Sequence, residues 1–377
     1  EGKAYILRRL PMQVQRIIDP MIGENIESRF TQAFTSFLEH TKNAFLTTED
    51  DNPDEQTEEK WNDTLNMHLE NLTLQYFLTN VVSKYAKKGI KEQLDHNTRA
   101  LEHGIFLSVA KQHTGDFLLA CPKTPSTTFQ PADFIFAVRA RLGCDLPNLP
   151  ARCSCKRKPY LNKKGTHLLS CAKGGSLIHR HDALMREVKA LALSAGVQAS
   201  SCSKDVIFRN GVANDNRMGD LLLPQCGENQ KNLIVDFTIT YPCSKSKLAA
   251  TRNNPSSSIN QATKTKNEKY KESAAACDTD FMPMALECYG ALSVELIHII
   301  RLLSEKRADL ANSNKSVVAQ YWYKRISCTL QKGNSRAVSK KLLDIAQVNH
   351  ADGNDECYDP IIDQEYANND TSMAIRS

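Results

Sequence analysis

Apolar side chains recur at helical spacing through much of the first 120 residues. They stand three and four positions apart in "IESRFTQAFTSFLEH" (26–40) and in "LNMHLENLTLQYFLTNVVSKYAKKG" (65–89). The acidic stretch "TTEDDNPDEQTEEK" (47–60) between them predicts a flexible loop, and "CPKTPSTTFQPAD" (121–133), with its three prolines, predicts a linker. We therefore expect a helical region over residues 1–130.

The second half of the chain mixes helical and strand-like patterns. A short helix is expected in "FIFAVRARLG" (134–143), and another from about His181 to Ala195, ended by Gly196. Short β-like runs follow at 205–208, 219–223 and 233–240. A helix from about Ile259 and helical blocks at 284–304 and 317–346 complete the order. This order predicts an α+β fold.

Charge is distributed unevenly along the chain, although the net charge is only +5. From Arg152 to Arg209 twelve Lys or Arg residues stand against three acids, and from Ser244 to Lys271 seven stand against one. The stretch 49–59 and the end of the chain from residue 350 are acidic, and we expect this tail to be disordered. A charge run is usually a solvated face, but the basic runs coincide with the candidate sites below and favour a polyanionic partner.

The remaining composition narrows the class of protein. Apolar runs such as 221–223 and 233–235 are too short to cross a bilayer, and the first residues show no secretory pattern, so we expect no membrane partner. Twelve cysteines in 377 residues favour reduced thiols, some of them holding metal. The first residue is Glu rather than Met, so we expect further sequence upstream.

The strongest motif for a metal is a Cys-x-Cys-x11-His-x3-Cys pattern. It consists of Cys153, Cys155, His167 and Cys171, with Gly165 before the histidine and Gly174-Gly175 after the last cysteine. Zinc prefers four such ligands in a tetrahedron, and a closed set of four indicates a structural role. Buried free cysteines beside a chance histidine are the alternative, and His179 and His181 are other candidate ligands with a less suitable spacing.

A second candidate site is a pair of carboxylates in a predicted β-hairpin. In "RMGDLLLPQCGENQKNLIVDFTIT" two apolar runs flank a turn, and pairing about position 228 places Asp220 opposite Asp236. Two converging carboxylates suit Mg²⁺, which could activate water for attack on a phosphodiester. The alternative is that both acids are surface residues of an edge strand.

A basic helix downstream could assist such a site. In "NQATKTKNEKYKES" Lys266, Lys269 and Tyr270 stand at i, i+3 and i+4 and share one helical face. A lysine beside a metal-bound acid pair could orient the attacking water or offset developing negative charge. Taken alone, the motif favours a solvated basic helix.

The order of these motifs resembles the C-terminal half of site-specific non-LTR retrotransposon reverse transcriptase polyproteins. The likeness covers roughly residues 130–335 and rests on the Cys/His pattern, "RHD" at 180–182, "GD" at 219–220, "VD" at 235–236 and "KNEKY" at 266–270. In that family a zinc knuckle precedes a restriction-like endonuclease of the PD-(D/E)xK type. The resemblance implies a Mg²⁺- or Mn²⁺-dependent nuclease that nicks DNA, in the nucleus, with element RNA as a further partner.

The resemblance also implies roles for residues. Asp220 and Asp236 would be the metal ligands, Lys266 the charge-stabilising lysine, and Lys269 and Tyr270 its support, with Glu187 as a weaker candidate for a third acid. Arg180 and His181 would contact the DNA backbone or brace the site. The loop of the knuckle would face phosphates, with the basic residues Lys156, Arg157, Lys158, Lys163 and Lys164.

The resemblance implies a domain organisation as well. It comprises a helical region over 1–130, a helix plus CCHC zinc knuckle over 131–178, a compact endonuclease-like core over 179–300, C-terminal helices over 301–349 and an acidic tail over 350–377.

Several positions depart from the family pattern. Gly219 replaces a proline, Asp182 replaces an asparagine, and Thr238 stands where simpler nucleases keep their lysine. The long gap from Asp236 to Lys266 is expected to be a loop, and no polymerase signature occurs. A catalytically inactive nucleic-acid-binding protein from a decayed or domesticated element is therefore the main alternative, and a purely structural interaction module is a second. The oligomeric state stays open.

Overall fold

The computed structural model describes residues 36, 38–46, 55–70, 84, 86–94, 99–202 and 219–351. The chain divides into two units, residues 1–97 and 98–377. The predicted strand at 205–208 and nearly all of the acidic tail lie outside the described residues. None of the helices in the described part is long and apolar enough to cross a membrane.

The first unit is helical where it is described, as the hydrophobic pattern predicts. The helix over 38–46 and α4 (Glu55–Glu70) share a small core, in which the rings of Phe45 and Trp61 lie 5.3 Å apart. The prediction of a loop up to residue 60 is wrong for the part from Glu55, where α4 begins. Glu, Gln and Lys are good helix formers, so a polar stretch without periodicity can still be helical.

The second unit contains helices on both sides of a four-stranded sheet, which confirms the α+β prediction. Its helices are α6 (Ala100–Val109), α7 (Pro131–Arg141), α8 (Ser176–Ser194), α9 (Leu248–Asn253), α10 (Ser257–Ala276), α11 (Val294–Ala311) and α12 (Lys315–Ala351). Its strands are β1 (Ser200–Ser201), β2 (Leu221–Leu223), β3 (Leu233–Thr240) and β4 (Asp280–Glu287). Short 3-10 turns span Asp116–Leu119, Thr166–Leu169 and Glu228–Gln230.

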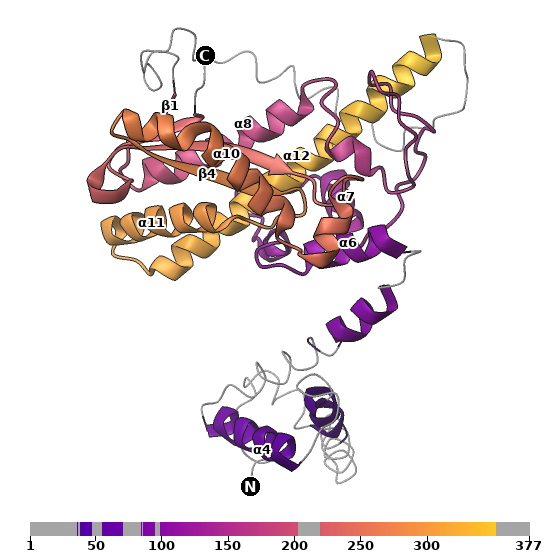
Figure 1. Cartoon of the computed structure of the whole chain (residues 1–377), viewed down its shortest axis with the longest axis vertical. Coiled ribbons are helices and arrows are strands. Elements are labelled where there is room, and N and C mark those ends of the chain that lie inside the picture. Colours follow the sequence, from indigo (N-terminus) through magenta and orange to yellow (C-terminus); the bar gives the residue numbers. More distant parts are fainter. Residues whose placement is uncertain are drawn as a thin grey trace. The chain divides into compact units, whose positions relative to one another are not determined.

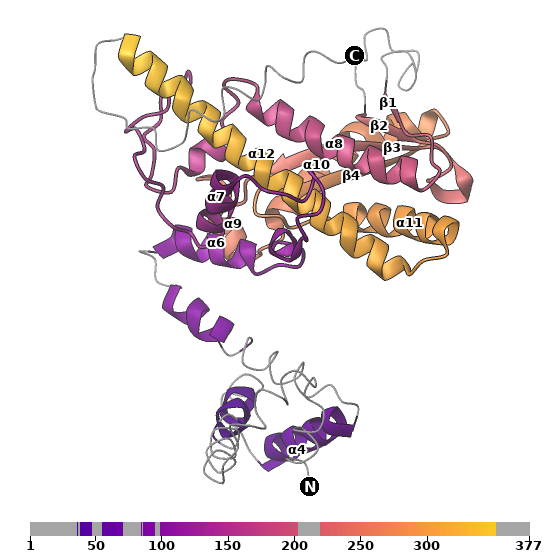
Figure 2. The ribbon, with the colours of Figure 1, turned by 180° about the vertical axis from the view of Figure 1, so that it is seen from behind.

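The strands lie in the order β1-β2-β3-β4, and three layers result (Figures 1 and 2). Strand β2 is antiparallel to both of its neighbours, β1 and β3. Strand β4 is parallel to β3 from Leu233↔Asp280 to Thr240↔Glu287. Because parallel strands need a crossover, α9 and α10 connect β3 to β4. Helix α10 covers one face of the sheet, and α8, α11 and α12 cover the other.

Alternation along β3 fixes these two faces. Leu233, Val235 and Phe237 enter the main core with α8, α11 and α12, whereas Ile234 packs with Tyr270 of α10. Successive strand residues point to opposite faces. Asp236, two positions after Ile234, therefore points towards α10 as the alternation predicts.

Two predictions about the stretches around the sheet are wrong. Residues 284–287 belong to strand β4 rather than to a helix, and the run from Pro283 to Glu287 is buried throughout. A strand covered on both faces reads as a continuous apolar run, which periodicity cannot tell from a buried helix. The gap between Asp236 and Lys266 is largely helical, because α9 and the first turns of α10 occupy it.

The proline-containing segment 121–133 is packed against α12 rather than acting as a free linker. Lys332 donates hydrogen bonds to the carbonyl oxygens of Pro125 and Thr128, and Arg325 donates one to Ser126. Phe129 packs on a small core that includes Cys328. Hydrogen bonds from α12 to these carbonyl oxygens therefore hold the segment in place.

Candidate functional site

The Cys/His motif is held by a short hairpin and a 3-10 turn. The backbone N–H of Cys153 donates to Pro159 O, and the N–H of Leu161 donates to Ala151 O, which closes a hairpin over 151–161 around the first two cysteines. The turn Thr166–Leu169 presents His167, after Gly165 with φ of 59°. Leu168 is fully buried beside it and anchors the turn. Local folding therefore brings both pairs of ligands to one place.

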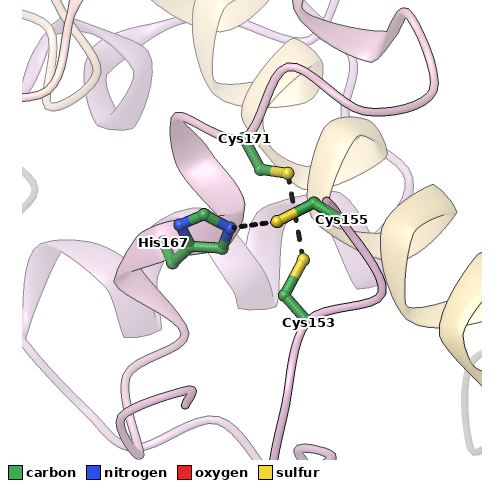
Figure 3. Close-up of side chains that lie close together, drawn as sticks. All are labelled: Cys153, Cys155, His167 and Cys171. Atoms are coloured by element: carbon green, nitrogen blue, oxygen red, sulfur yellow. Dashed lines mark hydrogen bonds between the residues drawn. The ribbon is translucent and has the colours of Figure 1, made fainter. Parts of the chain in front are cut away.

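The four side chains converge on a common centre (Figure 3). Their ligand atoms all lie within 4.8 Å of one another, with 3.8 Å between the sulfurs of Cys153 and Cys171 and 3.5 Å between Cys155 Sγ and His167 Nε2. A tetrahedral zinc site with Zn–S near ~2.3 Å and Zn–N near ~2.0–2.1 Å has edges of about 3.8 Å and about 3.5 Å. The separations fit a bound metal, and they are far from the ~2.05 Å of a disulfide. The cluster could therefore hold zinc.

Charges around the cluster suit a metal as well. Burial raises the pKa of Cys153 to about 12, so this thiol needs a cation to ionise. Burial, aided by Lys341 and Arg157, lowers the pKa of His167 and favours the neutral imidazole that binds metal. Lys341 of α12 is 3% exposed, and its charge acts on Cys153 and Cys171. Three thiolates on one divalent ion leave a net charge of about −1, which this ammonium offsets.

The hairpin that carries the acid pair has the predicted register. The observed partners Leu221↔Val235, Leu222↔Ile234 and Leu223↔Leu233 confirm pairing about position 228. Asp220 stands one residue before β2, and its backbone N–H donates to Val235 O at 2.8 Å. The paired register ends at Leu221↔Val235, so Asp220 lies just beyond it, close enough for its charge to act on Asp236.

Gly219 allows the chain to come this close to β3. A Cβ at this position would lie 2.3 Å from Ile234 Cγ2 and 3.2 Å from the carbonyl oxygen of Val235. No larger residue fits without movement. Gly219 stands where the family that the motif order resembles has a proline, and in this structure the glycine brings Asp220 against the strand.

Two donors hold the Asp220 carboxylate. Its Oδ2 accepts a hydrogen bond from the backbone N–H of Phe237 at 2.6 Å, and it lies 3.1 Å from His181 Nε2. The other ring nitrogen of His181 lies 3.1 Å from Asp182 Oδ1. His181 therefore joins α8 to the start of β2 across the end of the sheet.

Asp236 is 4% exposed and pairs with Lys266 of α10. Burial raises the pKa of Asp236, Lys266 opposes the rise, and the charge of Asp220 adds to it. Ionising the buried Asp236 carboxylate therefore costs free energy, and Lys266 of α10 stabilises the resulting charge.

The rest of the basic helix motif lies around the same pair. Tyr270 is buried between Ile234 and Phe281, and Lys269 Nζ donates to its hydroxyl oxygen at 2.7 Å. Burial raises the pKa of Tyr270, and the charge of Asp236 raises it further. The predicted face of α10 is therefore turned towards the acid pair. Within the described residues, however, no third His, Asp or Glu ligand atom converges with these two acids.

His181 makes the unfolding free energy depend on pH. Hydrogen bonds to Asp220 and Asp182 outweigh burial and raise its pKa from 6.5 to about 9. A raised folded-state pKa stabilises fully below pH 6.5 and loses its contribution as the pH rises through about 9. We expect the parent to lose about 1–2 kcal/mol over this window, after allowance for partial exposure, and His181→Gln to lose much less.

Urea denaturation at the two ends of that window measures the difference. His298→Gln, on the exposed side of α11, is the matched control and should follow the parent. An identical pH dependence in the parent and in His181→Gln would contradict the expectation.

Three predicted site residues lie elsewhere. Arg180 is 4% exposed and donates to Asn334 Oδ1 at 2.6 Å and to Leu169 O at 3.2 Å, so the structure favours bracing over contact with a DNA backbone. Glu187 accepts hydrogen bonds from Arg325 and Thr329, and it belongs to the α8–α12 contact rather than to the acid pair. Lys164 pairs with Glu102 and Asp145, which neutralise its charge.

The other basic residues of the predicted phosphate-facing loop are exposed: Lys156, Arg157, Lys158 and Lys163. Sequence reasoning misses two neighbours of this loop. Lys341 lies far away in the chain, and no spacing links it to the cysteines. Tyr160 carries a signal that could have been used, since it is the one aromatic residue within the basic run 152–164.

No protein-family model matches this chain, and no curated protein matches it at a significant level.

Proposed function

We propose that residues 131–300 form a zinc-stabilised, metal-dependent DNA endonuclease of the restriction-like type. The observation that carries this proposal is the acid pair, Asp236 on β3 and Asp220 just before β2, with Lys266 of α10 paired to Asp236. Asp220 and Asp236 would hold Mg²⁺ or Mn²⁺, whose preferred ligands are oxygens. The ion would activate water and stabilise charge on the phosphodiester, and Lys266 would offset the negative charge that develops.

Zinc in the Cys/His cluster is part of the same proposal. Its role would be structural, because all four positions of a tetrahedron are filled by the protein. The exposed basic loop beside it would supply contacts to DNA phosphates, and the motif order supports an origin in a non-LTR retrotransposon. A DNA substrate and such an origin would place the protein in the nucleus, with element RNA as a further partner.

A specific observation also favours the alternative, a nucleic-acid-binding protein without catalysis. Both carboxylates are already occupied: Asp220 by the Phe237 N–H and His181, and Asp236 by Lys266. A cation must compete with these groups for the oxygens. An inactive descendant would keep the zinc cluster and basic loop while these pairs close the acid site.

Nicking of supercoiled plasmid separates the two functions. The parent is expected to nick with Mg²⁺ or Mn²⁺ and to lose this activity on chelation of the added metal. Asp220→Ala and Asp236→Ala are expected to reduce the rate by about 10³-fold or more. Asp309→Ala, an exposed acid at the end of α11, is the matched control and should nick like the parent. No nicking by the parent, or equal nicking by all four proteins, refutes the nuclease.

A further inference from the structure

Tyr160 is an aromatic residue with an unusual position for a folded chain. It stands on the hairpin 151–161, opposite Arg152 in an isolated antiparallel bridge, and it is 72% exposed. Large aromatic side chains normally bury most of their surface, so one presented to solvent on an ordered strand indicates a contact surface. Its backbone neighbour Leu161 is tied to Ala151 by a hydrogen bond, so the ring does not sit on a loose loop.

Arg152 fixes the orientation of this ring. Its guanidinium carbon lies 3.7 Å from the centroid of Tyr160, and its Nη1 donates to Lys158 O at 3.3 Å. This cation–π contact covers one face of the ring, so the exposure comes from the other face and the edge. A ring held in advance loses little conformational freedom when a second planar group stacks on it.

The ring lies in a strongly basic setting. From Leu146 to His181 the sequence contains no Asp or Glu. Lys156, Arg157 and Lys158 form the exposed tip of the hairpin, and Lys163 is exposed just after it. Lys164, in contrast, is turned towards Glu102 and Asp145. The basic side chains left exposed therefore stand within four residues of Tyr160 in the sequence.

We propose that the hairpin 151–161 binds single-stranded nucleic acid, with a base stacked on Tyr160 and the flanking phosphates on Lys156, Arg157 and Lys158. Every base offers a planar face, and a basic groove with an aromatic platform binds unpaired strands with little sequence preference. In a duplex the faces are already stacked on their neighbours, so a duplex can use the charges but not the ring. An acidic polypeptide offers charge without a series of planar faces.

The metal cluster supports this surface from below. The same hairpin carries Cys153 and Cys155, and the tip is closed by the Lys158 N–H donating to Cys155 O at 2.9 Å. A metal on the two cysteines would therefore hold the first strand of the hairpin directly before its tip. The inference is independent of the nuclease chemistry, since it uses neither acid of the sheet.

Fluorescence anisotropy of a labelled oligothymidylate and of a short duplex tests the proposal. Tyr160→Leu is expected to weaken binding of the oligothymidylate roughly tenfold while leaving duplex binding nearly unchanged, and Tyr160→Phe should bind like the parent. Tyr321→Leu is the matched control, because Tyr321 of α12 is likewise an exposed aromatic residue beside an arginine, Arg325. Lys156→Gln should weaken both ligands and reduce the salt dependence by about one charge.

Zinc content and thermal unfolding of Tyr160→Leu must match the parent, which separates lost stacking from a collapsed hairpin. Three results overturn the proposal: oligothymidylate binding by Tyr160→Leu equal to that of the parent, an equal loss for the duplex, or competition by polyglutamate as effective as that by oligothymidylate. The anisotropy assay measures binding and requires no cleavage, so a failed nicking assay and a failed stacking test are distinguishable.

Discussion

Replacing Cys171 by serine is expected to release the metal and to unfold the segment around the cluster. Structural zinc supplies about 10–16 kcal/mol of apparent binding free energy in small zinc-dependent folds, and much of it depends on each thiolate. Cys153 and Cys171 are also part of a buried cluster with Leu168, Leu169 and Leu342, so the loss extends beyond the ligands. We expect the free energy of unfolding to fall by at least about 3 kcal/mol.

Zinc content of the purified protein and its thermal unfolding curve measure the two effects together. Cys144→Ser is the matched control, since Cys144 is an exposed thiol just ahead of the hairpin and outside the cluster. Cys144→Ser should keep one equivalent of zinc and the Tm of the parent. A Cys171→Ser variant that keeps both would show that the four side chains are free cysteines with a neighbouring histidine.

Replacing Lys266 by methionine is expected to destabilise the second unit by about 2–4 kcal/mol at neutral pH. The substitution leaves the carboxylate of Asp236 buried without its cation, which is the costly way to break a buried pair. The expected loss of stability is smaller than for a fully buried ion pair, because the Lys266 side chain is itself 24% exposed.

The stability lost in Lys266→Met depends on pH, and the direction of this dependence follows from the pKa of Asp236. Burial already raises this pKa above 3.8, and removal of Lys266 takes away the group that opposes the rise. The folded variant therefore keeps a proton that the unfolded chain releases. Its penalty is absent below pH 3.8, grows as the pH rises and is complete above the folded-state pKa.

Urea denaturation of a double-mutant cycle provides the measurement. The double variant Lys266→Met/Asp236→Asn should recover most of the lost stability, since no buried charge remains. Lys264→Met, whose side chain is 71% exposed beside Glu268, should change stability by less than about 0.5 kcal/mol. Additive effects in the cycle would mean that Lys266 and Asp236 do not interact.

The site features that sequence reasoning predicts are those encoded by local rules. The alternation along 233–240 defines β3 to the residue, and the turn residues around position 228 give the register that pairs Leu221 with Val235. The spacing of Lys266 and Tyr270 on α10 likewise defines one helical face. Period and turn chemistry act over a few residues, so they can be read without knowledge of the fold.

The features that escape sequence reasoning depend on distant contacts. Strand β4 is fixed by its pairing with β3 and by helices on both faces, so its apolar run carries no period of its own. Arg180 stands in a basic run, yet it is buried because Asn334, more than 150 positions later, accepts its hydrogen bond. No sequence pattern near residue 180 indicates that Asn334 is its partner.

The buried guanidinium of Arg180 joins three parts of the second unit. Its Nη1 donates to the carbonyl oxygen of Leu169 beside the metal cluster, to Cys288 Sγ just after β4 and to Asn334 Oδ1 on α12. The side-chain amide of Asn334 donates in turn to Cys288 O. These hydrogen bonds connect both the metal cluster and the end of the sheet to α12. The distance between the basic hairpin and the acid pair is therefore set by the fold of the second unit.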